Sequence, residues 1–167
     1  MNKMQEIRIE KLTFNMGVGD SGSKLDKAMK LLNTLTGQKP IATKAKRRIP
    51  TWGLRPGLTI GAKVTLRENK EEVLKRMLEA MGNKLEISKI GEGTFSFGIP
   101  EYLQIPDAKY DVEIGMMGLG VTATLERPGY RIKRRLNKKH IPKRHLISQK
   151  ETIEFLKTKF NVQFGEE

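Results

Sequence analysis

The chain has 167 residues and no Cys, and its 32 Lys or Arg against 19 Asp or Glu give a formal net charge of +13. The absence of Cys excludes disulfides, thiolate zinc sites and cysteine nucleophiles, and the length fits one domain spanning residues 1–167. The charged, alternating N-terminus does not resemble a signal peptide, and the longest uncharged run, residues 114–125, is shorter than the ~20 apolar residues of a membrane span. We therefore expect a soluble, cytoplasmic protein without membrane association, whose partner is polyanionic.

The basic residues are concentrated in two stretches that contain no acid. One lies between Asp26 and Glu68 and the other between Glu126 and Glu151, and each carries ten basic residues. The remaining 12 basic and 19 acidic residues leave the rest of the chain at −7. Because ordinary surfaces mix charges of both signs, this distribution favours two separate electropositive surfaces over solvated charged faces.

The first half of the chain predicts two strand–helix units. Alternation over residues 12–18 predicts a half-buried strand, followed by a helix from Ser23, with Asp26 at capping-box spacing, to a terminal Gly37. Two Pro and two Gly make residues 49–57 a loop after the short basic segment 41–48. Residues 58–67 alternate as a second strand, and a second helix runs from an Asn69 cap to Gly82.

The second half predicts shorter strands and one more helix. Alternating apolar residues indicate strands over residues 95–99, 112–116 and 121–125, whereas the basic stretch 127–147 is irregular. A final helix starts at about residue 149, after a Ser148 cap that pairs with Glu151. This order predicts an α+β fold, with a mostly antiparallel sheet, helices packed on one face and the other face exposed.

The exposed sheet face is a candidate RNA platform. In the two clearest strands the outward positions hold Thr13 and Asn15, and Thr59, Lys63, Thr65 and Arg67. Lys and Arg offer charge to phosphates, while Thr and Asn offer uncharged donors to phosphate and 2′-hydroxyl groups. An ordinary solvated sheet face is the alternative interpretation.

Trp52 stands out in the loop of residues 49–57, between Arg48 and Arg55. Two interpretations remain open for it. The side chain packs onto its own loop, or it contacts an outside partner by stacking on a nucleotide or packing against a ribose.

No motif carries a credible active site. Gly17-x-Gly19-x-x-Gly22 matches a dinucleotide fingerprint, but the acidic ribose ligand about 20 residues later is missing. His140 and His145 lack a third metal ligand, and Asp107, Asp111 and Glu113 lack a placed acid–base partner. We therefore expect no catalytic residues, metal or cofactor, although a phosphate-handling enzyme built on the Gly-rich turn is kept as the rival outside RNA binding.

Several segments together resemble the ribosomal protein L5 family of the large subunit. They are residues 12–19 (Leu-Thr-Phe-Asn-Met-Gly-Val-Gly), 36–40, 43–46, 60–67 (Ile-Gly-Ala-Lys-Val-Thr-Leu-Arg), 95–101 and 118–124. The basic segment from Arg127 onward resembles the archaeal and eukaryotic branch. The resemblance implies an α+β, non-enzymatic, ribosome-bound protein of the central protuberance, with 5S ribosomal RNA, 23S-type RNA and P-site tRNA as partners. It also implies contact with neighbouring central-protuberance proteins and a bridge to a small-subunit protein of the S-thirteen family. A free ribosome-assembly or translational-control factor is the rival within RNA biology.

The polar sheet face, the acid-free stretches and the resemblance together assign the site residues. Those expected to contact 5S RNA are Thr13, Asn15, Met16, Gly17, Thr43, Lys44, Lys46, Arg47, Lys63, Thr65 and Arg67. Those of the tRNA-facing loop are Arg48, Thr51, Trp52, Gly53 and Arg55. The basic tail, expected to contact ribosomal RNA, contributes Arg131, Lys133, Arg134, Arg135, Lys138, Lys139, Lys143 and Arg144.

Overall fold

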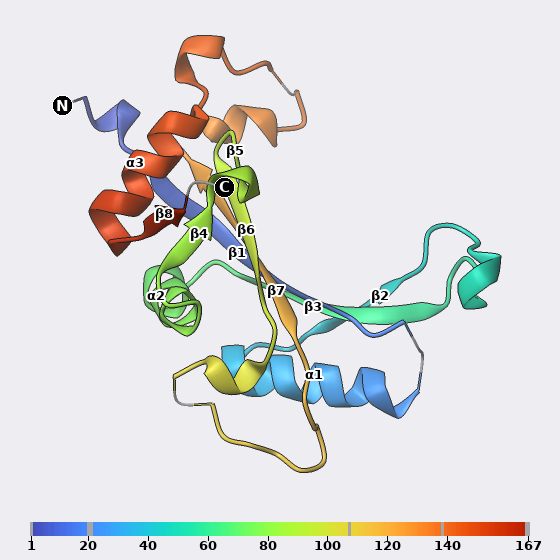
Figure 1. The fold of residues 1–167 in the computed structure, drawn as a ribbon. Coiled ribbons are helices and arrows are strands. Elements are labelled where there is room, and N and C mark those ends of the chain that lie inside the picture. Colours follow the sequence, from blue (N-terminus) through green and yellow to red (C-terminus); the bar gives the residue numbers. More distant parts are fainter. Residues whose placement is uncertain (1, 20–21, 107, 138, 166–167) are drawn as a thin grey trace.

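The computed structural model describes residues 2–19, 22–106, 108–137 and 139–165. These residues form three α-helices, eight strands and several short 3-10 turns (Figure 1). The helices are α1 (Ser23–Thr36), α2 (Lys70–Ala80) and α3 (Gln149–Phe160). The strands are β1 (Arg8–Gly17), β2 (Ile41–Lys44), β3 (Thr59–Leu66), β4 (Lys84–Glu86), β5 (Ile90–Gly91), β6 (Thr94–Ile99), β7 (Leu119–Glu126) and β8 (Gln163–Gly165).

Six of the strands form one antiparallel sheet in the order β2-β3-β1-β7-β6-β5, and β4 pairs in parallel with β8 beside it. The three α-helices lie on the same side of the large sheet, and the opposite side carries no described α-helix (Figure 1). The predicted α+β fold, with helices on one face and the other face open, is therefore confirmed. Within the described residues, no helix is both long and apolar enough to cross a membrane.

The core forms because the inward sheet positions meet the apolar faces of the helices. In β1 the period of two buries Leu12, Phe14 and Met16, and α1 buries Leu25 and Leu32 against the sheet. Burial of one such side chain contributes about 1.5–3 kcal/mol, so this shared core stabilises the sheet and its helices together. Of the buried apolar side chains in the described residues, all except Ala45, Leu54 and Ile141 belong to one cluster.

Helix ends follow the predicted signals in part. Gly37 ends α1 in the left-handed conformation with φ +66°, which glycine adopts without strain, and Ser148 and Glu151 form the predicted capping box of α3. The predicted Ser23 cap is wrong: Gly22 is the N-cap residue of α1 and provides no side-chain bond. Asn69 does occupy the N-cap position of α2, but its side chain makes no capping hydrogen bond.

Two strand assignments from the sequence are wrong. Residues 112–116 form turns rather than a strand, and of the alternating side chains there only Ile114 is buried. Residues 41–44, which the sequence did not identify as a strand, form β2 at the edge of the sheet next to β3. None of the four residues of β2 is buried, so the strand has no buried apolar alternation by which the sequence could mark it.

Candidate nucleic-acid interface

The face of the sheet without helices, called here the open face, carries a row of hydroxyl groups across four strands. Thr13 of β1 lies opposite Thr65 of β3 on one side and opposite Thr122 of β7 on the other, and Thr122 lies opposite Ser96 of β6. All four are outward positions of their strands. Hydroxyl groups both donate and accept hydrogen bonds, so this row offers uncharged contacts to a sugar–phosphate backbone.

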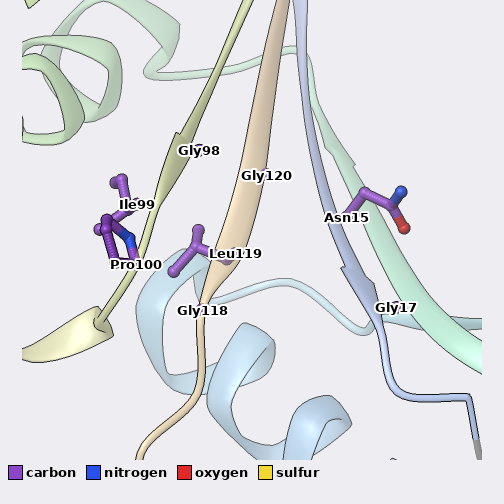
Figure 2. Close-up of a pocket in the computed structure, with 8 residues that line it drawn as sticks. All are labelled: Asn15, Gly17, Gly98, Ile99, Pro100, Gly118, Leu119 and Gly120. Carbon is purple, nitrogen blue, oxygen red and sulfur yellow. The ribbon is translucent and has the colours of Figure 1, made fainter.

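The next row on the open face runs from a cation to two glycines. Lys63 lies opposite Asn15, Asn15 opposite Gly120, and Gly120 opposite Gly98. A shallow depression of about 390 Å³ covers this end of the sheet (Figure 2) and is lined by Asn15, Gly17, Gly98, Ile99, Pro100, Gly118, Leu119 and Gly120. In Figure 2 the Asn15 amide points away from the Ile99 and Leu119 side chains, which lie toward the covered side of the sheet.

The glycines of this depression differ in what they do for the fold. A Cβ at Gly118 would lie 2.7 Å from the Pro100 carbonyl oxygen, so close packing requires glycine there. A Cβ at Gly17 or Gly98 would meet nothing within 4 Å, and neither residue has a positive φ. Their lack of a side chain therefore serves no internal contact and leaves the backbone accessible to a partner.

Cations border the open face on the β3 side. Lys63 and Arg67 are exposed outward residues of β3 and its end, and Lys44, Lys46 and Arg47 follow along the β2 edge, also exposed. None of these five is in an ion pair with another described residue. Thr43 of β2 lies opposite Gly61 of β3. These five charges of the first acid-free stretch are thus available to an outside anion.

Met16 differs from the other residues expected to contact 5S RNA. Its side chain is 2% exposed and lies in the core, whereas Asn15 and Gly17 on either side face outward. Alternation along a strand makes this unavoidable, so only the backbone of Met16 can reach a partner on the open face.

The loop between β2 and β3 is a folded extension of their hairpin. Ala45 and Leu58 continue the pairing through a 2.8 Å backbone hydrogen bond, and Ile49 and Leu54 form an isolated bridge that closes the tip. Leu54 is buried beneath the loop, while Trp52 at the tip is 74% exposed. The interpretation that Trp52 packs onto its own loop is therefore wrong. The other tip residues of the prediction, Arg48, Thr51, Gly53 and Arg55, are exposed as well.

The basic tail, residues 127–147, has two 3-10 turns, Tyr130–Lys133 and Lys143–His145, and no α-helix or strand in its described part. It is nevertheless held by specific polar contacts. The buried Arg127 guanidinium lies 2.6 Å from Glu151 of α3 and donates to the carbonyls of His145 and Leu146. Tyr130 donates its hydroxyl to the His145 carbonyl, and His145 Nε2 donates to the Pro128 carbonyl.

Part of the tail's charge is used inside the protein. Arg134 forms ion pairs of 3.0 Å with Glu10 and 2.7 Å with Glu126, and Arg8 pairs with the same Glu126. The other described tail cations are exposed and in no ion pair with described residues: Arg131, Lys133, Arg135, Lys139, Lys143 and Arg144. Lys138 lies outside the described residues.

Two residues at the junction between the tail and α3, Glu151 and Tyr130, have shifted pKa values. The pKa of Glu151 lies below its ordinary value because its carboxylate accepts a hydrogen bond from the Ser148 backbone N–H and, to a lesser degree, from Arg127. Burial raises the pKa of Tyr130. The lowered pKa of Glu151 favours its charged form opposite Arg127, at the junction between the tail and α3.

The structure gives no support to a dinucleotide site, a metal site or an acid–base pair. β1, which carries the start of the Gly17-x-Gly19-x-x-Gly22 pattern, pairs antiparallel with both neighbours, whereas a dinucleotide fold needs a parallel βαβ unit. Within the described residues no three His, Asp or Glu side chains gather as a metal site. Asp111 and Glu113 are both ion-paired with Lys30, and Asp107 lies outside the described part of the chain.

Comparison with known proteins identifies the family. The family model described as "Ribosomal protein L5" matches residues 2–55, and a companion model for the C-terminus of the same ribosomal family matches residues 59–160. The chain belongs to the ribosomal protein L5 family. A ribosomal protein is a structural component rather than an enzyme, so membership also confirms the expected non-enzymatic character.

Among its relatives are archaeal proteins named "Large ribosomal subunit protein uL5". That of Sulfurisphaera tokodaii is 51% identical over 99% of this chain and 96% of its own length. That of Nanoarchaeum equitans is 50% identical over 96% of each chain, and that of Aeropyrum pernix is 45% identical over 96% of this chain and 86% of its own. Such coverage includes most or all of the basic tail, which agrees with the resemblance to the archaeal branch.

The sequence assignment missed half of the open face. Ser96, Gly98, Gly118, Gly120 and Thr122 lie on the same surface as Asn15 and Thr65, but only as a consequence of strand order. The signal that could have found them is the same period-two alternation, since Ser96 and Thr122 occupy the polar positions of their strands.

Proposed function

We propose that this constituent of the large ribosomal subunit binds 5S ribosomal RNA through the open face and helps attach it to the 23S-type RNA in the central protuberance. The observation that carries the proposal is the open face itself: a sheet surface without described α-helices, with rows of hydroxyl, amide and glycine positions, bordered by cations that form no ion pair with a described residue. Phosphate and ribose contacts from such groups position RNA without base-specific reading. As a ribosomal protein the chain resides in the cytoplasm, bound to the ribosome.

Each group of predicted residues has its own role in this proposal. Lys63 and Arg67 meet phosphates, Thr13, Asn15 and Thr65 bond riboses and phosphates, and Lys44, Lys46 and Arg47 extend the contact along the β2 edge beside Thr43. Gly17 and the backbone of Met16 admit the RNA closely. The exposed cations of the tail bind large-subunit RNA. Residues 1–167 act as one RNA-binding domain, since a single sheet joins the segments matched by the two family models.

The loop between β2 and β3 contacts P-site tRNA in this proposal. Its bridge and buried Leu54 hold the tip in one shape before any partner arrives, and the exposed Trp52 is free to stack on a nucleotide or pack against a ribose. Further partners are neighbouring central-protuberance proteins and a small-subunit protein of the S-thirteen family, across the subunit bridge.

Sedimentation with crosslinking tests the proposal against the rival of a free assembly or translational-control factor. We expect the chain to sediment with large subunits in near one-to-one amount and to crosslink to 5S RNA under ultraviolet light. Recovery mainly in ribosome-free fractions would favour the free factor. Crosslinks confined to 23S-type RNA would indicate that another protein binds 5S RNA.

A further inference from the structure

The open face ends in a pocket where the sheet meets the basic tail. Beyond the row of hydroxyl groups described above, the next outward positions of β7 and β6 are Thr124 and Thr94, which lie opposite each other. These two threonines line a pocket of about 260 Å³ together with residues of the tail. Figure 1 shows the tail, in orange, beside β5 at this end of the sheet. The pocket therefore continues the open face, one strand repeat of about 7 Å beyond its hydroxyl row.

The tail supplies the walls of this pocket, and its own contacts hold them in place. Tyr130 donates its hydroxyl to the His145 carbonyl at 2.8 Å, and the two rings meet edge to face with their centres 5.6 Å apart. Leu146 and Ile147 add apolar surface to the lining. Aromatic and aliphatic side chains are the surroundings in which proteins hold unstacked bases of RNA, so these walls suit the flat face of a base.

Glu92 gives the pocket a hydrogen-bonding edge that phosphate cannot use. It lines the pocket, is exposed and forms no ion pair with a described residue. Glu10, the other acid of the lining, is paired with Arg134 at 3.0 Å. A free carboxylate repels phosphate and only accepts hydrogen bonds, so its best partners in RNA are the N–H groups of bases. Among the four bases only guanine presents two such groups side by side, at N1 and N2, and one carboxylate can accept from both.

Lys133 adds a cation that is free to meet the same base. It lines the pocket, is exposed and forms no ion pair with a described residue. Its ammonium can donate to O6 or N7 of guanine or to the adjoining phosphate. Arg134, by contrast, is held by Glu10 and Glu126 and keeps the tail against the sheet. The pocket thus combines an acceptor edge, a free cation and an apolar wall.

We propose that this pocket, called here the base pocket, receives one unpaired guanine of 5S RNA, whose N1–H and N2–H groups donate to Glu92 and whose ring packs against Tyr130 and Leu146. Phosphate and ribose contacts along the open face carry no sequence information, whereas the base pocket reads one base. The inference rests on the proposed binding of 5S RNA by the open face and adds base recognition to it. The tail then belongs to the same binding surface as the sheet.

The sign of one substitution separates base recognition from simple electrostatics. Glu92→Gln removes a negative charge from an RNA-binding surface, which by itself would raise 5S affinity or leave it unchanged. If Glu92 accepts hydrogen bonds from a guanine, 5S affinity should instead fall roughly tenfold, within the usual range for a bidentate contact between a side chain and a base. Glu79→Gln, which changes an exposed acid of α2, is the control and should leave 5S affinity unchanged. Unchanged or higher affinity in Glu92→Gln would overturn the proposal.

Kethoxal footprinting identifies the base that enters the pocket. This reagent modifies N1 and N2 of unpaired guanines, the two atoms that Glu92 would cover. At saturating protein, the native chain should protect one guanine of 5S RNA that stays reactive with Glu92→Gln. The same guanine should stay reactive with Leu146→Trp, which fills the pocket without changing the charge. Equal protection of every guanine by the three proteins would contradict the proposal.

The double variant Lys63→Ala/Arg67→Ala distinguishes a failure of this inference from a failure of the proposed function. If it lowers 5S affinity while Glu92→Gln does not, RNA lies on the open face but no guanine enters the base pocket. If neither variant lowers 5S affinity, the open face itself is not the RNA site. Tight binding of GMP to the chain alone, lost in Glu92→Gln, would assign the pocket to a free nucleotide and overturn its role in RNA binding.

Discussion

The open face and the basic tail belong to stretches with the same formal charge, but different forces hold them in place. Backbone pairing positions the open face, so its side chains project at fixed intervals and its cations remain unpaired among the described residues. Distant side chains position the tail, with Arg127 tied to Glu151 and Arg134 to Glu10 and Glu126. The formal charge of a stretch is therefore an upper limit on the charge that a partner can meet, because some cations form ion pairs within the protein.

The largest expected effect comes from breaking the anchor of the tail. Arg127→Met leaves Glu151 without its cation and the His145 and Leu146 carbonyls without a donor. We expect unfolding to become easier by roughly 3 kcal/mol, near the lower end for a buried pair because Glu151 is partly exposed. Urea unfolding measures this loss, and limited proteolysis should show faster cleavage within residues 127–147.

The neighbouring Lys150 provides a matched control, since it is exposed and forms no ion pair with the described residues. Lys150→Met should change stability by less than about 0.5 kcal/mol, as most surface substitutions do. If both variants unfolded alike, the tail would not depend on the Arg127 pair, and the contrast with the open face would disappear.

Trp52→Ala probes the loop without touching the open face. We expect 5S affinity and stability to stay unchanged, because the side chain is 74% exposed and lies at the loop tip. Binding of tRNA to the P site should weaken by about 1–3 kcal/mol, the usual contribution of one aromatic–base stack. Filter binding of tRNA to ribosomes carrying the variant checks this. Weaker 5S binding instead would show that the loop assignment is wrong.

The cap of α3 adds a smaller effect with a pH dependence. Ser148→Ala removes the hydroxyl that bonds Glu151 and should cost about 1 kcal/mol. The pKa of Glu151 is lowered in the folded protein, so its contribution is complete above the ordinary value of 4.5 and is lost as pH falls through the folded pKa. Thermal unfolding from pH 6 to pH 3 should show a shallower decline for Glu151→Gln than for the native chain. If the stability of the two proteins fell equally with pH, the Glu151 carboxylate would not contribute to the pH dependence.

Gly98→Ala has the smallest expected effect on stability, and it has the opposite sign. An added Cβ meets nothing within 4 Å, so stability should rise by up to about 1 kcal/mol as the unfolded chain loses freedom. Affinity for 5S RNA should fall if the RNA approaches this backbone closely. Gly118→Ala is the contrasting variant, since its Cβ would clash with Pro100 and destabilise the sheet. Unchanged RNA affinity in Gly98→Ala would show that the RNA does not bind closely at the depression.

The same comparison explains how much of the molecule could be predicted from the sequence. Local period sufficed for β3, most of β1, the three helices and the outward positions of Asn15, Lys63 and Thr65, and the capping box was predicted correctly for α3. The tail could not be predicted, because its contacts join residues far apart in the chain, such as Arg134 and Glu10, and depend on α3 being in place. The strand predicted over residues 112–116 was wrong, because the alternating apolar side chains there are one buried residue, Ile114, between two exposed residues, Val112 and Met116.

The central claim, that the open face binds 5S RNA, is tested most directly by the salt dependence of binding. Removing Lys63 and Arg67 together should weaken 5S binding and reduce the log–log salt slope by roughly 1.8, taking about 0.9 per phosphate contact. Lys75→Ala/Lys84→Ala removes the same charge from α2 and β4 and should leave the slope unchanged. Equal slopes for Lys63→Ala/Arg67→Ala and the native chain would contradict the claim and put the RNA on another surface.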